Sequence, residues 1–153
     1  MYISQESVWD QLTHNRVLTA SGVSWFVAQS CKVLIGVIEE KRFNFKWFVG
    51  SGGMPSSHTA FVMAAAVSIG IRYGYQSDLF AAVAVFAFVT MFDAQGVRRH
   101  SGKQAEALNR IFDDIYAHRE LEWEPLKELF GHTPLEVIAG ALIGIFTALL
   151  FAG

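Results

Sequence analysis

The segment VIAGALIGIFTALLFAG, residues 137–153, gives the first indication of the class of fold, because it is apolar throughout and carries no charged side chain. Extended back to Thr133 it has 21 residues with Glu136 as the only charge, and about 20 apolar residues cross the hydrocarbon core of a membrane. Gly140 and Gly144 stand four residues apart, a spacing that lets membrane helices approach closely. A buried helix of a soluble protein would fit the same pattern, so this segment alone leaves two classes open.

Three further apolar stretches favour the membrane; they lie at residues 17–38, 58–71 and 79–92. Lys32 is their only charged residue. The two shorter stretches reach the length of a span when their polar flanks, 55–73 and 77–97, are included. We therefore predict an all-α integral membrane bundle of about four membrane helices, forming a single domain over residues 1–153.

The composition agrees with this class and excludes several others. Apolar residues make up 52% of the chain and charged residues 17%, below the usual share of about 25% in soluble domains. Such a chain is too apolar to be disordered, and a formal charge of −2 offers no basic excess for nucleic acid. Cys31 is the only cysteine, which excludes a disulfide framework. The first 16 residues mix charges without an apolar run, so no signal peptide is expected.

Charged residues concentrate in residues 98–130, which hold 13 of the 26 formal charges. Within this region Leu108, Ile111, Phe112 and Ile115 recur at the spacing of one helix face, which predicts an amphipathic helix. A shorter helical piece, WEPLKELF, is expected to follow it.

The distribution of basic residues predicts which side of the membrane each loop faces. If all four segments cross, both termini and the 72–78 loop share one side, which carries Arg16 and Arg72. The other side carries nine basic residues: Lys41, Arg42, Lys46, Arg98, Arg99, Lys103, Arg110, Arg119 and Lys127. Because basic loops stay cytoplasmic, we expect this second side to face the cytoplasm. If the source is bacterial, the membrane that holds the protein is expected to be the cytoplasmic membrane.

The first candidate site motif is SGGMPSSH at residues 51–58, on the basic side. Its glycines allow the backbone to turn N–H groups inward, and Pro55 suits the first helical position. A helix start with two serine hydroxyls is a natural seat for phosphate, and His58 can deliver a proton near neutral pH. An ordinary capped helix start with an incidental histidine is the alternative.

The second motif is GHTPLE at residues 131–136, also a helix start with proline at the first position. Thr133 and Glu136 form a capping box, which suffices to explain Glu136 structurally. Alternatively, Glu136 orients the imidazole of His132, which then attacks phosphorus as a nucleophile. The two roles need not exclude each other.

The third motif is DAQGVRRHSGKQ at residues 93–104. The forked donors of Arg98 and Arg99 suit phosphate oxygens, although basic residues at the headgroup level also anchor helices. Asp93 ends an apolar helix and needs a partner, for which we expect Arg98 or Arg99. Lys32 lies deep in an apolar stretch, where it either snorkels to the headgroups or pairs with a carboxylate or a phosphate.

The three blocks GGMPSSH, FDAQGVRRHSGKQAEALN and KELFGHTPLEVIAG, in this order, resemble the divergent branch of the type 2 phosphatidic acid phosphatase and vanadium haloperoxidase superfamily. The resemblance implies a helical membrane protein related to metal-independent lipid phosphatases. In that superfamily one histidine forms a phosphohistidine, a second protonates the leaving group, and Lys and Arg hold the phosphate. By this match His132 is the nucleophile, Glu136 its partner, and His58 the general acid.

The sequence also departs from the superfamily pattern. Ser57 stands where the second motif has glycine, and Glu136 stands where the third has aspartate. The leading Lys of the superfamily has only Lys32 and Lys46 as candidates here. Its Ser-Arg pair precedes the nucleophile closely, whereas Arg98 lies more than 30 residues before His132. The phosphate cradle must therefore be rebuilt from other parts of the chain, or it is lost.

The leading hypothesis is a membrane phosphatase for a lipid or isoprenoid phosphate that uses neither metal nor cofactor. Its expected catalytic residues are His132, His58 and Glu136, its phosphate ligands Ser56, Ser57, Gly53, Arg98, Arg99, Lys32 and Lys46, and its structural partner Asp93. One alternative is a catalytically inactive membrane protein that binds a phosphate headgroup or a protein partner. Another is a metal-dependent phosphotransferase that uses Asp93, Asp113 and Asp114. A homo-oligomer formed through Gly140 and Gly144 is a further expectation.

Overall fold

The computed structural model describes residues 7–43, 53–116 and 131–152, and within α6 it describes only the backbone of residues 97–101 and 113–116. Six helices make up these ranges: α1 (Val8–Thr13), α2 (Arg16–Glu40), α4 (Ser57–Tyr73), α5 (Asp78–Gln95), α6 (Val97–Tyr116) and α7 (Pro134–Leu150). No strand occurs in the described ranges, which confirms the all-α prediction.

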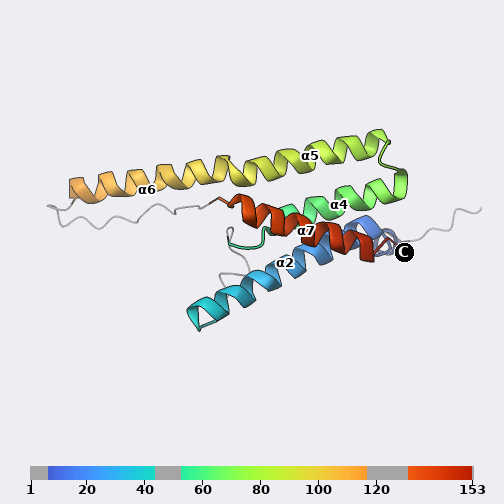
Figure 1. The fold of residues 1–153 in the computed structure, drawn as a ribbon, viewed down its shortest axis with the longest axis horizontal. Helices are drawn as coiled ribbons and strands as arrows, with labels where there is room; N and C mark the ends of the chain where they lie inside the picture. The colour runs from blue at the N-terminus through green and yellow to red at the C-terminus, as the bar shows by residue number, and fades with distance from the viewer. Residues whose placement is uncertain (1–6, 44–52, 117–130, 153) are drawn as a thin grey trace, which may run out of the picture.

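Four helices form an antiparallel bundle, in which α2 and α5 run one way and α4 and α7 the other (Figure 1). The central helix α4 contacts α2, α5 and α7. Helix α6 continues beyond the bundle in nearly the same direction as α5, and α5 is its contacting helix among those described (Figure 1). The start of α2 and the end of α7 therefore lie at one end of the bundle, and the starts of α4 and α7 lie at the other.

The helix starts follow side-chain caps that the sequence supplies. Thr133 caps α7 in a capping box with Glu136, and Pro134 takes the first helical position, as predicted. The prediction that Pro55 takes the first helical position of α4 is wrong: the Ser56 hydroxyl accepts a hydrogen bond from the Thr59 amide, so Ser56 is the cap and the helix begins at Ser57, two residues later.

The bundle is packed with small side chains inside and large apolar side chains outside. Most of its fully buried apolar residues are alanines, including Ala20, Ala28, Ala60, Ala64 and Ala148. Large apolar side chains are exposed instead; examples are Leu34, Phe86, Phe88, Phe92, Leu142, Phe146 and Leu150. A water-soluble protein rarely exposes so much contiguous apolar surface, whereas close packing through small residues is typical of helices in a membrane.

Gly140 and Gly144 bring α7 against α4 of the same chain. A Cβ atom at Gly144 would lie 2.5 Å from the Ala60 carbonyl oxygen, and one at Gly140 would collide with the Ser56 carbonyl. The predicted close approach through these glycines thus occurs within the chain, and self-association of the protein stays a prediction.

Two of the four expected spans are long and apolar enough to cross a membrane by length and composition: α2 with 25 residues and α5 with 18. Helix α7 is apolar but has 17 residues, and α4 also has 17. Of the amphipathic region predicted at 98–130, α6 accounts for the part up to Tyr116, while the WEPLKELF piece lies outside the described residues.

Candidate functional site

Three predicted motifs meet at one end of the bundle, where α4 and α7 begin and α5 ends (Figure 1). Two backbone hydrogen bonds tie these helix ends together. The Ser56 amide donates to the Glu136 carbonyl oxygen at 3.0 Å, and the His132 amide donates to the Ala94 carbonyl oxygen at 2.9 Å. The predicted topology therefore places the residues of the three motifs next to one another.

His132 is buried, with 2% of its surface exposed, and its Nδ1 lies 2.8 Å from Glu136 Oε2. The same carboxylate oxygen accepts from the Thr133 amide at 3.2 Å, while the Thr133 hydroxyl accepts from the Glu136 amide. Glu136 therefore completes the capping box and contacts the imidazole at once, so both roles expected of it coexist. A carboxylate beside Nδ1 holds the proton on that nitrogen and leaves Nε2 with its lone pair.

Lys32 of α2 lies near His132 and Glu136, and we call these three residues the His132 cluster. It is 7% exposed, and its ammonium interacts electrostatically with Glu136. Its aliphatic stem passes Gly53, where a Cβ atom would lie 3.6 Å from two of the Lys32 carbons. Burial of Lys32 argues against snorkelling, because a snorkelling side chain would place its head in water. Its electrostatic interaction with Glu136 is consistent with pairing to a carboxylate, and contact with a phosphate stays a prediction.

The start of α4 is buried around its two serines. Ser56 Oγ accepts from the Thr59 amide at 3.4 Å and from the Thr59 hydroxyl at 3.0 Å, both within the start of α4. The Ser56 amide donates to the Glu136 carbonyl oxygen, and this hydrogen bond joins the start of α4 to α7. Ser57 is also buried, and its hydroxyl has no hydrogen-bond partner among the described side chains, whereas His58, the second residue of α4, is exposed.

The basic residues of the third motif are described in part. Asp93 is half-buried, next to Ala94, while the side chains of Arg98 and Arg99, and all of Lys46, lie outside the described parts. The pairing of Asp93 with either arginine thus stays a prediction, and so does every metal role for Asp113 and Asp114. Further along α6, Gly102 and Asn109 are buried while Lys103 and Arg110 are exposed, so the two pairs lie on different faces of the helix.

Two polar residues that contribute to this region were missed by the sequence analysis. Gln29 is 3% exposed and lies one turn before Lys32 on the same face of α2. Thr59 is fully buried and holds Ser56 in place. The signal for Gln29 was a polar side chain three residues from the only charge in an apolar stretch, a spacing that puts both on one helix face.

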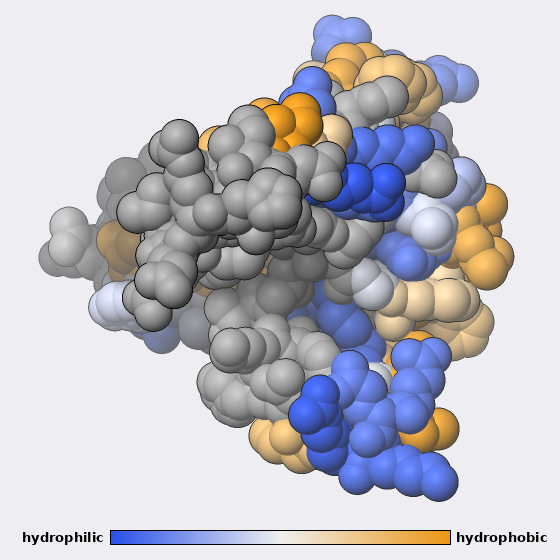
Figure 2. All heavy atoms as spheres, turned by 90° about the vertical axis from the view of Figure 1, so that its left-hand side faces the viewer, coloured by the Kyte–Doolittle hydropathy of each residue, from blue (hydrophilic) through white to orange (hydrophobic). Residues whose placement is uncertain are grey.

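Figure 2 faces this end of the molecule and shows hydrophilic residues where α2 ends, toward the bottom, and along α6, toward the top. Hydrophobic residues lie on the flanks (Figure 2). Hydrophilic residues are thus exposed at this end of the bundle, while large apolar side chains are exposed along its helices.

Comparison with known proteins agrees with these features. The profile of the Divergent PAP2 family, where PAP2 denotes type 2 phosphatidic acid phosphatase, matches residues 13–147. The chain belongs to this family. It is also 39% identical to the "Uncharacterized membrane protein YuiD" of Bacillus subtilis (strain 168) over 153 residues, which cover 93% of this chain and 97% of the relative. No solved structure matches.

The family and the relative confirm the resemblance drawn from the three motifs and identify a PAP2-like membrane protein. The matched region runs from the start of α2 to the last turn of α7, so it includes every residue of the His132 cluster.

Proposed function

We propose that this Divergent PAP2 protein is a membrane phosphatase that hydrolyses a lipid or isoprenoid phosphate through a phosphohistidine on His132. The contact of 2.8 Å between His132 Nδ1 and Glu136 Oε2 carries this proposal. A nucleophilic histidine needs one ring nitrogen with a free lone pair and the other fixed by a hydrogen bond, and this pair supplies that arrangement.

In the proposed reaction His132 Nε2 forms a bond to phosphorus while the bond from phosphorus to the ester oxygen breaks. His58 gives its proton to the departing alcohol. A water molecule then attacks the phosphohistidine, loses a proton to His58, and breaks the bond between phosphorus and nitrogen, which releases inorganic phosphate. Both histidines return to their starting states, and no electron acceptor is consumed.

Positive charge and hydrogen-bond donors near His132 support the phosphoryl group in this scheme. Lys32 lies beside Glu136 and Gly53, and the Ser57 hydroxyl lies at the start of α4. We assign Arg98, Arg99 and Lys46 to the same role, from their places in the sequence. Fixed cations and donors stabilise the charge that develops on phosphoryl oxygens in the transition state.

The substrate class follows from where the cluster lies. It sits at the end of helices whose outer faces are apolar, a position that suits a phosphate attached to a long apolar chain in the membrane. We also propose that this end faces the cytoplasm, because nine basic residues against two fall on its side.

The test uses purified full-length protein in liposomes that contain phosphatidic acid or farnesyl phosphate, with EDTA present. We expect phosphate release by the wild type and a loss on the order of 10³-fold or more in His132→Gln, as for the loss of other catalytic nucleophiles. Thr133→Ala is the matched control: it removes the helix cap beside His132 and keeps the imidazole with its carboxylate. Full activity in His132→Gln would overturn the proposal.

A second candidate function is the binding of a phosphate headgroup without turnover. Two backbone amides at the site favour this alternative because they already make hydrogen bonds within the protein. The Ser56 amide donates to the Glu136 carbonyl oxygen, and the His132 amide donates to the Ala94 carbonyl oxygen. It predicts that the protein retains a lipid phosphate without releasing phosphate, and that His132→Gln leaves this retention unchanged.

A further inference from the structure

An apolar groove runs between α2 and α7. Val23 and Val27 of α2 form one wall, and residues from Leu142 to Phe151 at the end of α7 form the other. The groove has a volume of about 420 Å³, and Thr147 is the only polar residue among the described residues that line it. The Thr147 hydroxyl donates to a carbonyl oxygen of its own helix at 2.7 Å, so the groove presents a hydrocarbon surface.

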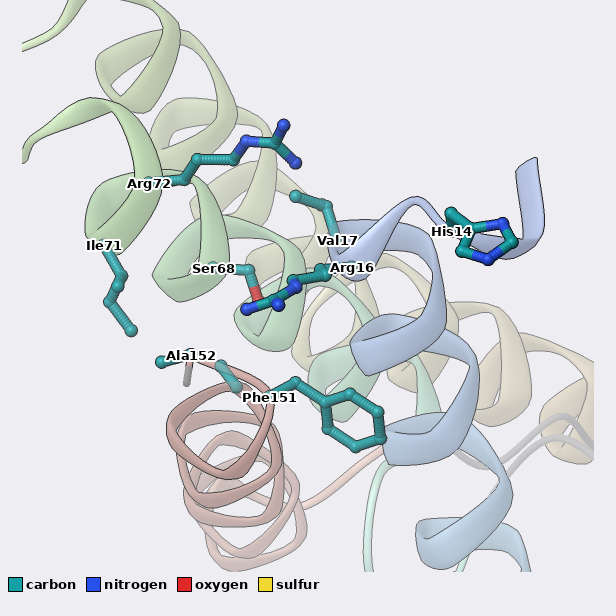
Figure 3. A pocket seen from close by; sticks show the side chains of 9 residues that line it. His14, Arg16, Val17, Ser68, Ile71, Arg72, Phe151 and Ala152 are labelled. Atoms are coloured by element: carbon teal, nitrogen blue, oxygen red, sulfur yellow. The ribbon is translucent and has the colours of Figure 1, made fainter. Parts of the chain in front are cut away.

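The groove leads toward the His132 cluster along the same two helices. Val27 precedes Lys32 by five residues and Ile143 follows Glu136 by seven, so both lie about 8–11 Å from the cluster at 1.5 Å per residue. The separation of seven residues also puts Ile143 on the same face of α7 as Glu136. At the far end the ring of Phe151 points from α7 toward α2 (Figure 3). The groove therefore begins near the site and ends near the opposite end of the bundle.

The lengths of the helices indicate that the cluster lies below the surface of the membrane. Helices α4 and α7, whose starts build the site, have 17 residues each, about 26 Å, whereas the hydrocarbon core is about 30 Å thick. Helix α2 continues for eight residues beyond Lys32, to Glu40, and α6 continues beyond α5 (Figure 1). The cluster is thus recessed between longer helices, at the depth where headgroups meet hydrocarbon tails.

We propose that the groove holds the hydrocarbon tail of the phosphorylated lipid, which reaches the His132 cluster sideways from the bilayer between α2 and α7. This placement of the tail rests on the proposed function, which supplies the phosphate end. The α7 wall from Leu142 to Phe151 is about 14 Å long, close to the roughly 15 Å that the tails of one leaflet span. Because surrounding lipid is as apolar as the groove, the groove positions the phosphate beside His132 rather than adding hydrophobic affinity.

Photolabelling of a variant that lacks the nucleophile shows where the tail lies. Full-length His132→Gln protein in liposomes receives phosphatidic acid or phosphatidylcholine with a diazirine in the middle of one tail, and the labelled residues are mapped by mass spectrometry. We expect phosphatidic acid to label the groove in preference to the exposed face of α5 around Val85 and Phe88, on the order of tenfold, which corresponds to about 1.4 kcal/mol. Phosphatidylcholine, whose phosphate is blocked by choline, should label both surfaces alike.

Substitutions in the groove test the same placement. Val27→Trp and Leu142→Trp each fill the groove from one wall, and both side chains are exposed, which makes them tolerant of a larger ring. Each variant should remove the preference of phosphatidic acid for the remaining residues of the groove. Val85→Trp is the matched control, since it adds the same ring to the exposed face of α5, and it should keep the preference.

Three outcomes would overturn the placement of the tail. Equal labelling of the groove and of α5 by phosphatidic acid would show only the general contact of an apolar surface with the bilayer. A preference for the groove that phosphatidylcholine shares would show a seat for any lipid. A groove that neither lipid labels, together with crosslinks between copies of the chain, would show that a second copy covers it.

Phosphate release separates this placement from the proposed function. Release that depends on His132, without a preference of phosphatidic acid for the groove, would overturn the placement of the tail and leave the phosphatase standing. A preference for the groove without any phosphate release by the wild type would overturn the phosphatase and support the placement.

Discussion

Glu136 interacts with four residues, three through its carboxylate and one through its backbone carbonyl. Its carboxylate accepts from the Thr133 amide, contacts His132 Nδ1 and attracts Lys32, while its carbonyl accepts from the Ser56 amide. Sequence reasoning found the first two contacts because those residues are neighbours on one helix start. It could not assign Lys32, because nothing local to α2 says which helix it packs against.

Replacing Glu136 by Gln separates its role as a helix cap from its role beside the imidazole. The amide can still accept the cap hydrogen bond, but it loses the charge that stabilises a proton on Nδ1. We expect kcat for phosphate release to fall on the order of 10²- to 10⁴-fold with KM little changed, by analogy with the loss of other orienting carboxylates. Steady-state kinetics in liposomes measures this. Equal effects of Glu136→Gln and Thr133→Ala would mean that Glu136 acts only as a cap.

The Lys32 and Glu136 pair predicts energetic coupling between α2 and α7. Lys32→Met and Glu136→Gln should each destabilise the protein, because each leaves a charge beside a neutral group, the buried Lys32 in one case and the half-buried Glu136 in the other. The double variant should cost less than the sum of the two, with a coupling free energy of about 0.5–3 kcal/mol. Thermal or denaturant unfolding in detergent measures the cycle, and strictly additive effects would contradict the pairing.

At the scale of helices, α4 and α7 approach closely beside the site. Gly140 faces the carbonyl of Ser56, the residue whose amide binds Glu136, so backbone packing and site geometry depend on the same contact. The sequence showed the spacing of the two glycines but not their partner helix. The predicted start of α4 was two residues too early, because both Pro55 and Ser56 are residues typical of a helix start, and in the structure Ser56 is the cap.

Gly140→Ala should push α7 away from α4. We expect a loss of about 1–3 kcal/mol in unfolding free energy, as for overpacking elsewhere, together with lower activity, because the displacement moves Glu136 away from Ser56. Gly22→Ala is the matched control in α2, since a Cβ there meets nothing within 4 Å, and its stability should be unchanged or raised by up to about 1 kcal/mol. Similar losses in both variants would contradict the close approach of α4 and α7.

At the scale of the whole molecule, the number, order and approximate bounds of the apolar helices could be predicted from hydrophobic runs and caps. The face that each helix turns toward the inside of the bundle could not be predicted in this way. Helix α2 is predominantly apolar and its faces differ little in hydrophobicity, so hydrophobic periodicity does not identify its inner side. The inner sides are instead marked by small residues, a signal that becomes readable only once the neighbouring helix is known.

The antiparallel bundle predicts opposite labelling of its two ends. In a Cys31→Ser background, Gln76→Cys between α4 and α5 should react with an impermeant maleimide in intact cells, whereas Lys103→Cys in α6 should react only after permeabilisation. Both positions are exposed, so access depends on the side of the membrane. Labelling of Lys103→Cys in intact cells would place the His132 cluster on the outer side and contradict the orientation.

Trapping the intermediate shows whether His132 carries the phosphoryl group during turnover. The wild-type protein in liposomes is mixed with phosphatidic acid labelled at its phosphate, quenched in base, and mapped by mass spectrometry. We expect an acid-labile phosphoryl group on His132 that forms without added metal and decays by hydrolysis, and that is absent from His132→Gln. Steady phosphate release with no label on His132 would contradict it.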